Sequence, residues 1–271
     1  MRKTLLIVSV VAALLAAAVQ ADSIQTWKSG ETTVTLENGA LTVSGTGAME
    51  NHHTIRQIGA WHESSNPAPW RDVKNSITGV VIEYGVTYIG NYTFWDCKNL
   101  TSVTIPNSVR KIGGGAFAGC LGLTSVTIPN SVTNIGVQAF GGSGLTSMTI
   151  PDSVTKIHSS TFSFCENLTS VTIPDGVWWI GDLAFYGCIS LKSITLPSSV
   201  KEIEILAFQD CPALITVIVK NPVPPEIHHS AFFDKGKRNC LYVPKNSINA
   251  YRAANIGKEF GCIKGIESAP K

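Results

Sequence analysis

The sequence carries little charge, and the charges of the two signs nearly balance. Only 15% of its 271 residues are charged, against about 25% in an ordinary soluble domain. The 21 Lys and Arg residues face 19 Asp and Glu residues. A protein that binds nucleic acid by electrostatics needs a basic excess, and an acidic disordered chain needs the opposite. We therefore expect neither class.

The sequence also lacks the short motifs that carry chemistry. It contains no G-x-S-x-G nucleophile elbow, no H-E-x-x-H zinc motif and no G-x-x-x-x-G-K-[ST] phosphate loop. Carboxylates such as Glu202 and Glu204 are expected on a repeated surface rather than opposite one another in a pocket. The sequence therefore predicts a protein that is not an enzyme and that needs no cofactor.

No metal-binding pattern stands out either. None of the seven cysteines forms a C-x-x-C pair, which is the spacing typical of zinc sites. The histidines that lie close in sequence fall in irregular segments, and we interpret them as exposed loop residues rather than metal ligands. They are His52, His53 and His62, and the pair His228 and His229.

The first 21 residues have the form of a secretory signal peptide. Arg2 and Lys3 precede an apolar run that ends in small residues at Ala21. A polar segment begins directly at Asp22, where a membrane anchor would need a longer apolar stretch and a stop signal. We expect cleavage after Ala21, which leaves 19 basic and 19 acidic residues. The mature protein is then neutral, exported and without a membrane span.

Most of the remaining chain repeats one phrase with a period of 23 residues. A looser copy begins at Ile77 and a degraded copy at Leu214, and the copy at Leu123 is one residue short. A period in the twenties is typical of a solenoid, in which each coil buries its apolar face against its neighbours. The complete copies begin at Leu100, Leu123, Leu145, Leu168 and Leu191.

Each unit has apolar residues at positions 1, 4, 6, 10, 13, 18 and usually 21. In the first complete unit, Val103 and Ile105 alternate with Thr104, which predicts a short strand with Thr104 on the outside. The strand is expected to end at Pro106, because proline has no N–H for the ladder. Gly113 is expected to allow the later bend of the coil. Such strands stack about 4.8 Å apart into a parallel sheet.

The segments outside the repeats are expected to cap the rod. A β-hairpin is predicted over residues 34–43, with its turn at Glu37, Asn38 and Gly39. Residues 248–254 are the one favourable helical stretch, with Asn246 or Ser247 as the N-cap. The predicted fold is thus a β-rich solenoid in one elongated domain. Its parts are a signal peptide over 1–21, an N-terminal cap over 22–76, the repeats over 77–240 and a C-terminal cap over 241–271.

The unit L-x-x-V-x-I-P-x-S-V-x-x-I-G-x-x-A-F-x-x-C closely resembles the BspA-like class of bacterial leucine-rich repeats. The resemblance covers roughly residues 77–240. The phrases at 41–49 and 69–70 are similar to the segment that often precedes such repeats, and those at 242–244 and 250–251 to the segment that often closes them. The resemblance implies a secreted or surface protein and a binding scaffold, because several members are adhesins that bind host matrix proteins or other cells.

Five cysteines occupy position 21 of their units, and Ser143 takes that place in the short copy. We interpret this position as a small buried side chain that closes each coil, since cysteine is among the most buried residue types. Cys240 and Cys262 lie off the repeat and are candidates for a disulfide in an oxidising compartment. The repeated cysteines are Cys97, Cys120, Cys165, Cys188 and Cys211.

Positions 11 and 12 vary between copies and point to a candidate contact surface. Most copies are polar there, whereas one has two adjacent tryptophans. Aromatic and cationic side chains are enriched at binding hot spots, although the rings could instead fold back over a neighbouring coil. Position 19 adds two aromatic residues on another rim. The candidates are Trp178, Trp179, Lys156, Lys201 and Tyr88, and at position 19 Trp95 and Tyr186.

These observations favour an exported or surface-displayed leucine-rich-repeat protein that binds an extracellular protein without catalysis. The ligand would belong to host matrix or to the surface of another cell. The alternative is a carbohydrate-binding module or accessory protein, because exposed aromatic rings also stack on sugars. No nucleic acid is expected as a partner.

Overall fold

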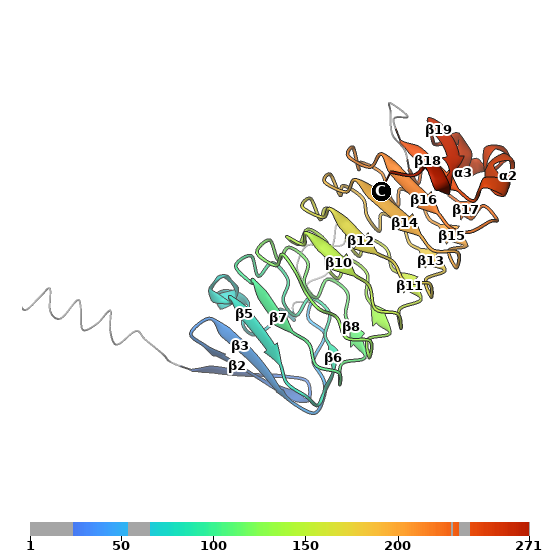
Figure 1. The fold of residues 1–271 in the computed structure, drawn as a ribbon. Coiled ribbons are helices and arrows are strands. Elements are labelled where there is room, and N and C mark those ends of the chain that lie inside the picture. The colour runs from blue at the N-terminus through green and yellow to red at the C-terminus, as the bar shows by residue number, and fades with distance from the viewer. Residues whose placement is uncertain (1–23, 54–65, 229, 233–238, 271) are drawn as a thin grey trace, which may run out of the picture.

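The computed structural model describes residues 24–53, 66–228, 230–232 and 239–270, and in them the chain winds into a β-solenoid (Figure 1). Two rows of short strands run along the rod. One row uses positions 3 to 6 of each unit and the other uses positions 12 and 13. The predicted fold is confirmed. The expected signal peptide lies outside the described residues.

The first row of strands grows from the N-terminal hairpin. Strand β1 (Gln25–Ser29) pairs antiparallel with β2 (Thr32–Glu37), and β2 pairs antiparallel with β3 (Ala40–Gly45). Strand β3 then pairs in parallel with the first repeat strand, β5 (Gly79–Ile82). The predicted hairpin is therefore present and joined to the solenoid sheet, while β1 was not predicted. The row continues through β7 (Ser102–Thr104), β10 (Ser147–Thr149), β12 (Ser170–Thr172), β14 (Ser193–Leu196) and β16 (Thr216–Val219).

The second row places position 12 of successive coils side by side. Tyr88 lies in register with Lys111, and Trp179 lies between Lys156 and Glu202. Position 13, the next residue along each strand, is buried. Because neighbouring residues of a strand point to opposite faces, position 12 faces outward. The strands are β4 (Gly47–Ala48), β6 (Val86–Ile89), β8 (Lys111–Ile112), β9 (Asn134–Ile135), β11 (Lys156–Ile157), β13 (Trp179–Ile180), β15 (Glu202–Ile203) and β17 (Glu226–Ile227).

The parallel ladder continues into the segment that the sequence assigns to the C-terminal cap. Strand β18 (Cys240–Val243) pairs with β16, and β19 (Cys262–Gly265) pairs with β18. The predicted helix is α2 (Ile248–Ala253), and Ser247 precedes it without a side-chain capping bond. None of the helices in the described ranges could cross a membrane. The remaining helices are α3 (Asn255–Lys258) and the 3₁₀ helices η1 (Arg71–Ser76), η2 (Lys245–Ser247) and η3 (Ile266–Ser268).

The strand predicted in every copy is missing from one of them. Residues 125–127 form no strand, although the same positions do so in the neighbouring coils. This unit is also the short one, because Gly144 alone separates Ser143 from Leu145. A hollow of about 470 Å³ opens here between Ser125 and Ser147. The lost residue thus coincides with an interruption of the first row.

A column of phenylalanines runs through the core. The rings of Phe117 and Phe140 stack with centroids 5.4 Å apart and planes within 9°, and the stack ends against Trp70 at one cap and Phe260 at the other. Because every coil contributes its position-18 ring, the stack ties the caps to all the coils between them. It consists of Phe94, Phe117, Phe140, Phe162, Phe185, Phe208 and Phe232.

Close approach between coils explains Gly113. A Cβ atom there would lie 2.6 Å from the backbone nitrogen of Asn91, and Gly113 does not have a positive φ. The prediction that Gly113 is needed for its backbone freedom is therefore wrong. Glycine is needed there because a larger side chain would collide with the neighbouring coil. The left-handed conformation falls instead at position 16, mostly on residues with side chains, such as Gln138 at φ 58° and Leu206 at φ 59°.

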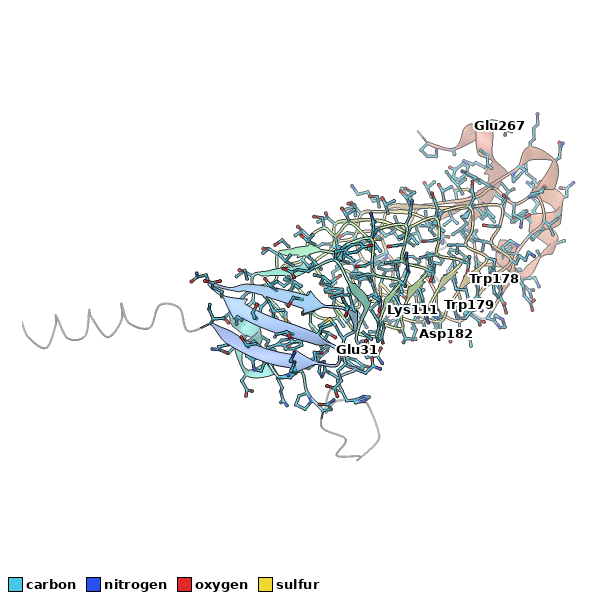
Figure 2. All side chains as sticks on the ribbon, turned by 90° about the horizontal axis from the view of Figure 1, so that it is seen from below. Glu31, Lys111, Trp178, Trp179, Asp182 and Glu267 are labelled. Carbon is cyan, nitrogen blue, oxygen red and sulfur yellow. A yellow bond between two sulfur atoms is a disulfide. The ribbon has the colours of Figure 1, made fainter. Side chains whose placement is uncertain are left out.

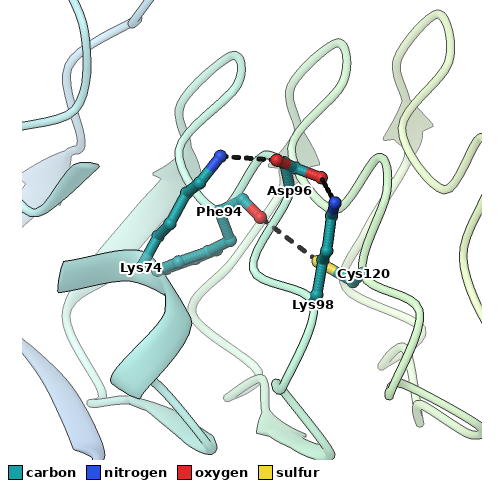
Figure 3. Close-up of polar contacts among 5 residues, drawn as sticks. All are labelled: Lys74, Phe94, Asp96, Lys98 and Cys120. Atoms are coloured by element: carbon teal, nitrogen blue, oxygen red, sulfur yellow. Dashed lines mark hydrogen bonds and ion pairs between the residues drawn. The ribbon is translucent and has the colours of Figure 1, made fainter. Parts of the chain in front are cut away.

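The position-21 cysteines are buried thiols, as the repeat predicts. Cys120 is fully buried and its Sγ donates a hydrogen bond to the carbonyl oxygen of Phe94, one coil earlier (Figure 3). Beside it, Asp96 pairs with Lys74 and Lys98 near the surface. All five are free, and only Cys211 is part exposed. Cys240 and Cys262 are joined by a disulfide, with their Cα atoms 4.7 Å apart.

Candidate contact surface

The structure places Lys156 in register with Trp179 on the second row of strands. Figure 2 shows Trp178 and Trp179 next to each other. The Nζ atom of Lys156 lies 4.5 Å from the ring centroid of Trp178 and 5.9 Å from that of Trp179. Trp178 remains 37% exposed. A cation over an indole face is attracted by the ring quadrupole. The pair therefore orders an aromatic side chain while leaving it accessible.

Hydrogen bonds and ring contacts hold Trp179 more firmly. Its Nε1 donates to Oε1 of Glu204 at 3.0 Å, and its ring meets His158 edge-on at 6.1 Å. Burial lowers the pKa of His158, and the charge of Lys156 lowers it further. A neutral imidazole is thus favoured beside the lysine. Trp179 is half-buried and supports the more exposed Trp178.

Lys201 belongs to the next coil and borders the same surface. Its backbone N–H donates to the carbonyl oxygen of Trp178 at 2.9 Å, and the residue is exposed. Together, Lys156, Trp178, Trp179 and Lys201 define what we call the tryptophan surface. Three adjacent coils supply it, which is why these residues are close although up to 45 positions separate them in sequence.

Tyr88 occupies the same row but lies apart from the tryptophan surface. Four coils separate it from Trp179, or about 19 Å at the spacing of parallel strands. Its hydroxyl is bonded to Asn51 and Asn91, and burial raises its pKa. A shallow hollow of about 810 Å³ extends between Tyr88 and His158 over small residues such as Gly113.

The two position-19 aromatics are not part of the tryptophan surface. Trp95 lies under Lys74, whose Nζ is 4.8 Å from the ring centroid, and lines a cavity of about 280 Å³ at the N-terminal cap. Tyr186 donates to Asp210 at 2.6 Å, and this bond raises its pKa. Trp95 and Tyr186, which the sequence assigns to one further rim, therefore lie at two different places on the molecule.

His52 lines the same N-terminal cavity, and the prediction that it is an exposed loop residue is wrong. It is only 1% exposed, where an exposed loop residue was predicted. Its ring packs edge-on against Trp70 at 5.4 Å, and burial lowers its pKa. A neutral histidine is favoured there because the charged form would lose its water. His62 and His229 lie outside the described residues.

Sequence reasoning missed one cluster beside the tryptophan surface. The ligand atoms of Glu202, Glu204 and His228 all lie within 4.8 Å of one another. The sequence treats the two glutamates as unconnected surface residues and the histidine as part of a loop pair. Only the register of β15 with β17 brings them together. A signal was present: Glu204 stands at position 14, where four other coils have glycine.

Comparisons with known proteins agree with this architecture. Residues 73–176 and 133–255 match the family model described as the BspA type leucine rich repeat region, in six copies. A search of curated proteins found no match.

Solved structures of other repeat proteins are similar to this chain. A leucine-rich repeat protein from Bacteroides ovatus is 22% identical over 90% of this chain, with a TM-score of 0.61; the match spans 66% of that protein, just under two thirds of its length. One from Eubacterium ventriosum is 21% identical over 90% of this chain and 85% of its own, with a TM-score of 0.48. At 22% identity, the similarity to the Bacteroides ovatus structure shows a common fold and nothing about function.

Proposed function

Because the chain belongs to the BspA-type leucine-rich repeat family, we propose that it is a non-catalytic binding protein that recognises an extracellular protein through the tryptophan surface. The observation that carries the proposal is Trp178, an indole that is 37% exposed and held under the ammonium group of Lys156. Tryptophan is among the residue types that are enriched at the hot spots of protein interfaces.

The rigidity of the surface supports a binding role. Backbone hydrogen bonds join the coils of Thr155, Trp178 and Lys201 in sequence, so the contact residues stand on a fixed sheet. Ordering flexible side chains during association costs free energy. Since the indole of Trp179 is already bonded to Glu204, little of that cost remains for this side chain.

An oxidising compartment fits the chemistry of the chain. Cys240 and Cys262 form a disulfide between β18 and β19, and such bonds persist in exported proteins. The expected signal peptide over residues 1–21 agrees with this. We therefore propose that the protein acts outside the cytoplasm, where host matrix or another cell's surface offers ligands.

The test is a binding screen with matched variants. The full chain, Trp178→Ala/Trp179→Ala and Tyr84→Ala are presented to a panel of extracellular matrix proteins and to a glycan array. Tyr84 is an exposed aromatic residue far from the tryptophan surface, and its variant controls for loss of any ring. We expect a protein ligand whose binding is lost in the double variant and retained in Tyr84→Ala.

Two outcomes would contradict the proposal. If the double variant keeps every protein ligand, the tryptophan surface is not the contact site. If only glycans bind, and the double variant loses them, the carbohydrate-binding alternative replaces the proposal. Far-UV circular dichroism of each variant checks that the solenoid is intact.

A further inference from the structure

We propose that Glu202, Glu204 and His228 bind a divalent transition-metal ion of the zinc type. The inference does not rest on the binding role of the tryptophan surface, although Trp179 belongs to that surface and also contacts this site. It starts from three potential ligand atoms within 4.8 Å of one another on the outside of the second row of strands.

The repeat places these side chains on one face. Glu202 and Glu204 flank the buried Ile203, so both point outward from β15. Ile227 pairs with Ile203 in the next coil, which sets His228 beside Glu204. The backbone N–H of His228 also donates to the carbonyl oxygen of Ile203 at 2.9 Å. The three residues are thus held by the sheet.

The distances suit coordination better than an ion pair. Nε2 of His228 lies 3.4 Å from Oε1 of Glu202 and 3.5 Å from Oε2 of Glu204. A charge-assisted N–H···O bond is shorter, at about 2.7 to 2.9 Å. Ligands of a tetrahedral zinc ion, with bonds of about 2.0 to 2.1 Å, lie about 3.3 Å apart. Two edges of such a site are therefore already close to their required length.

The local charge calls for a cation. Two carboxylates face the same small space, and among the described residues no lysine or arginine forms a salt bridge with either of them. Their side chains are 33% and 19% exposed, and that of His228 is 40% exposed. Like charges held together on a partly buried surface repel one another, and a bound divalent ion would remove that cost.

Trp179 orients one of the ligands. Its indole N–H occupies Oε1 of Glu204, which leaves Oε2 directed to His228. Metal-binding carboxylates are usually fixed by such an outer hydrogen bond. Trp179 would therefore act as a positioning residue for the ion.

The repeat itself does not need these side chains. Position 14 is glycine at Gly90, Gly113, Gly136 and Gly181; His158 takes it in the coil before Gly181, and Glu204 and His228 take it in the two later coils. The solenoid folds at this column without any side chain in four coils, so a structural requirement does not explain the glutamate and histidine.

The donor set selects the kind of ion. One imidazole nitrogen and two carboxylate oxygens suit zinc and its neighbours, whereas calcium takes six to eight oxygen ligands. Three protein ligands leave a position open to water or to a donor from a partner.

The experiment is calorimetric titration of the full chain with zinc chloride alone, with calcium chloride in a parallel titration. We expect one zinc ion per chain. Glu204→Gln and His228→Ala should weaken its binding by roughly tenfold or more, and Trp179→Phe by roughly tenfold. Cobalt in place of zinc should give the visible absorption of a tetrahedral nitrogen and oxygen site, which His228→Ala removes.

Two controls keep the test specific. Glu226→Gln removes one charge from the neighbouring strand β17, and His158→Ala removes an imidazole beside Trp179; both should bind zinc like the wild type. Zinc binding that survives His228→Ala and Glu204→Gln, no zinc binding at all, or calcium binding in its place would overturn the proposal. Circular dichroism confirms that each variant is folded. Because no protein ligand is present, failure here leaves the tryptophan surface untouched.

Discussion

The thiol of Cys188 donates a hydrogen bond to the carbonyl oxygen of Phe162, one coil earlier, at 3.2 Å. Cys165 makes the same bond to the carbonyl oxygen of Phe140. Position 21 therefore supplies a small donor that adds a second hydrogen bond to a carbonyl already paired with a backbone N–H. Ser143 is a donor of similar size in the short copy, and its Oγ lies 3.4 Å from Sγ of Cys165. The cysteine at position 21 therefore serves as a buried hydrogen-bond donor in each coil, and its repetition along the rod needs no redox role.

Stability should fall in alkaline solution because these thiols are buried. Burial raises the pKa of Cys165 from 9.0 to about 11. Between those values the unfolded chain loses the proton while the folded chain keeps it, so the free energy of unfolding decreases by about 1.4 kcal/mol per pH unit for this thiol. The contribution is complete below pH 9 and is lost toward pH 11. Urea unfolding at several pH values measures it, and Cys165→Ala should flatten the slope.

A glycine at position 138 should stabilise the solenoid. Gln138 has φ 58°, its side chain is exposed, and left-handed backbone costs a residue with a Cβ about 1 to 2 kcal/mol. Gln138→Gly should therefore raise the free energy of unfolding by about 1 kcal/mol. Thr133→Gly, at an exposed site of the same coil without a positive φ, should lower it instead. Equal effects of the two changes in chemical denaturation would refute the explanation.

The phenylalanine column should dominate stability. Phe140 is fully buried and stacked between Phe117 and Phe162, so Phe140→Ala should cost about 3 to 5 kcal/mol. Phe164 is 55% exposed, and Phe164→Ala should cost much less. Thermal unfolding of both variants is the measurement, and similar losses would contradict the role of the column.

Lys156 and Trp178 should be energetically coupled. A double-mutant cycle with Lys156→Met and Trp178→Ala should give a coupling of about 0.5 to 1 kcal/mol, the usual size for an exposed cation over a ring. The methionine keeps the length of the side chain and removes its charge. A second cycle pairs Lys201→Met with Trp178→Ala as the reference. Lys201 makes no cation–π contact with any ring in the described part of the chain, so this cycle should show no coupling.

Reduction should loosen the C-terminal end. The bond between Cys240 and Cys262 closes a loop with a sequence separation of 22, for which chain entropy predicts about 3 kcal/mol of stabilisation. Dithiothreitol should lower the melting temperature, and Cys240→Ser/Cys262→Ser should be insensitive to it. Thiol titration of the denatured, unreduced chain should find five free thiols, and seven would disprove the disulfide.

The sequence predicted the coil well because its period is set by local chemistry. Pro106 marks the end of a strand, and Ile105 and Phe117 are buried in the core. Because the same residue types recur in every copy, the structure predicted for one unit holds for the others. Glu204 stands out in the sequence at a position where four coils have glycine, but its grouping with Glu202 and His228 depends on the register of β15 and β17. The extra residue in the last copy, which pairs Glu202 with Glu226, hides that register in the sequence.

The surroundings of Trp178 and Trp179 could be predicted from the sequence only in part. Its outward position followed from the repeat, but the lysine above Trp178 and the glutamate beside Trp179 come from different coils. Tyr88 was grouped with them because it shares position 12, and position within a unit says nothing about distance along the rod.

The in-register pairing of position 12 has a geometric consequence for any partner. Side chains in this row stand on a grid whose step is the strand spacing of about 4.8 Å. A partner that contacts two of them must therefore match a whole number of steps. Duplication or loss of a complete unit between two contacts would change their separation by one step without altering either contact.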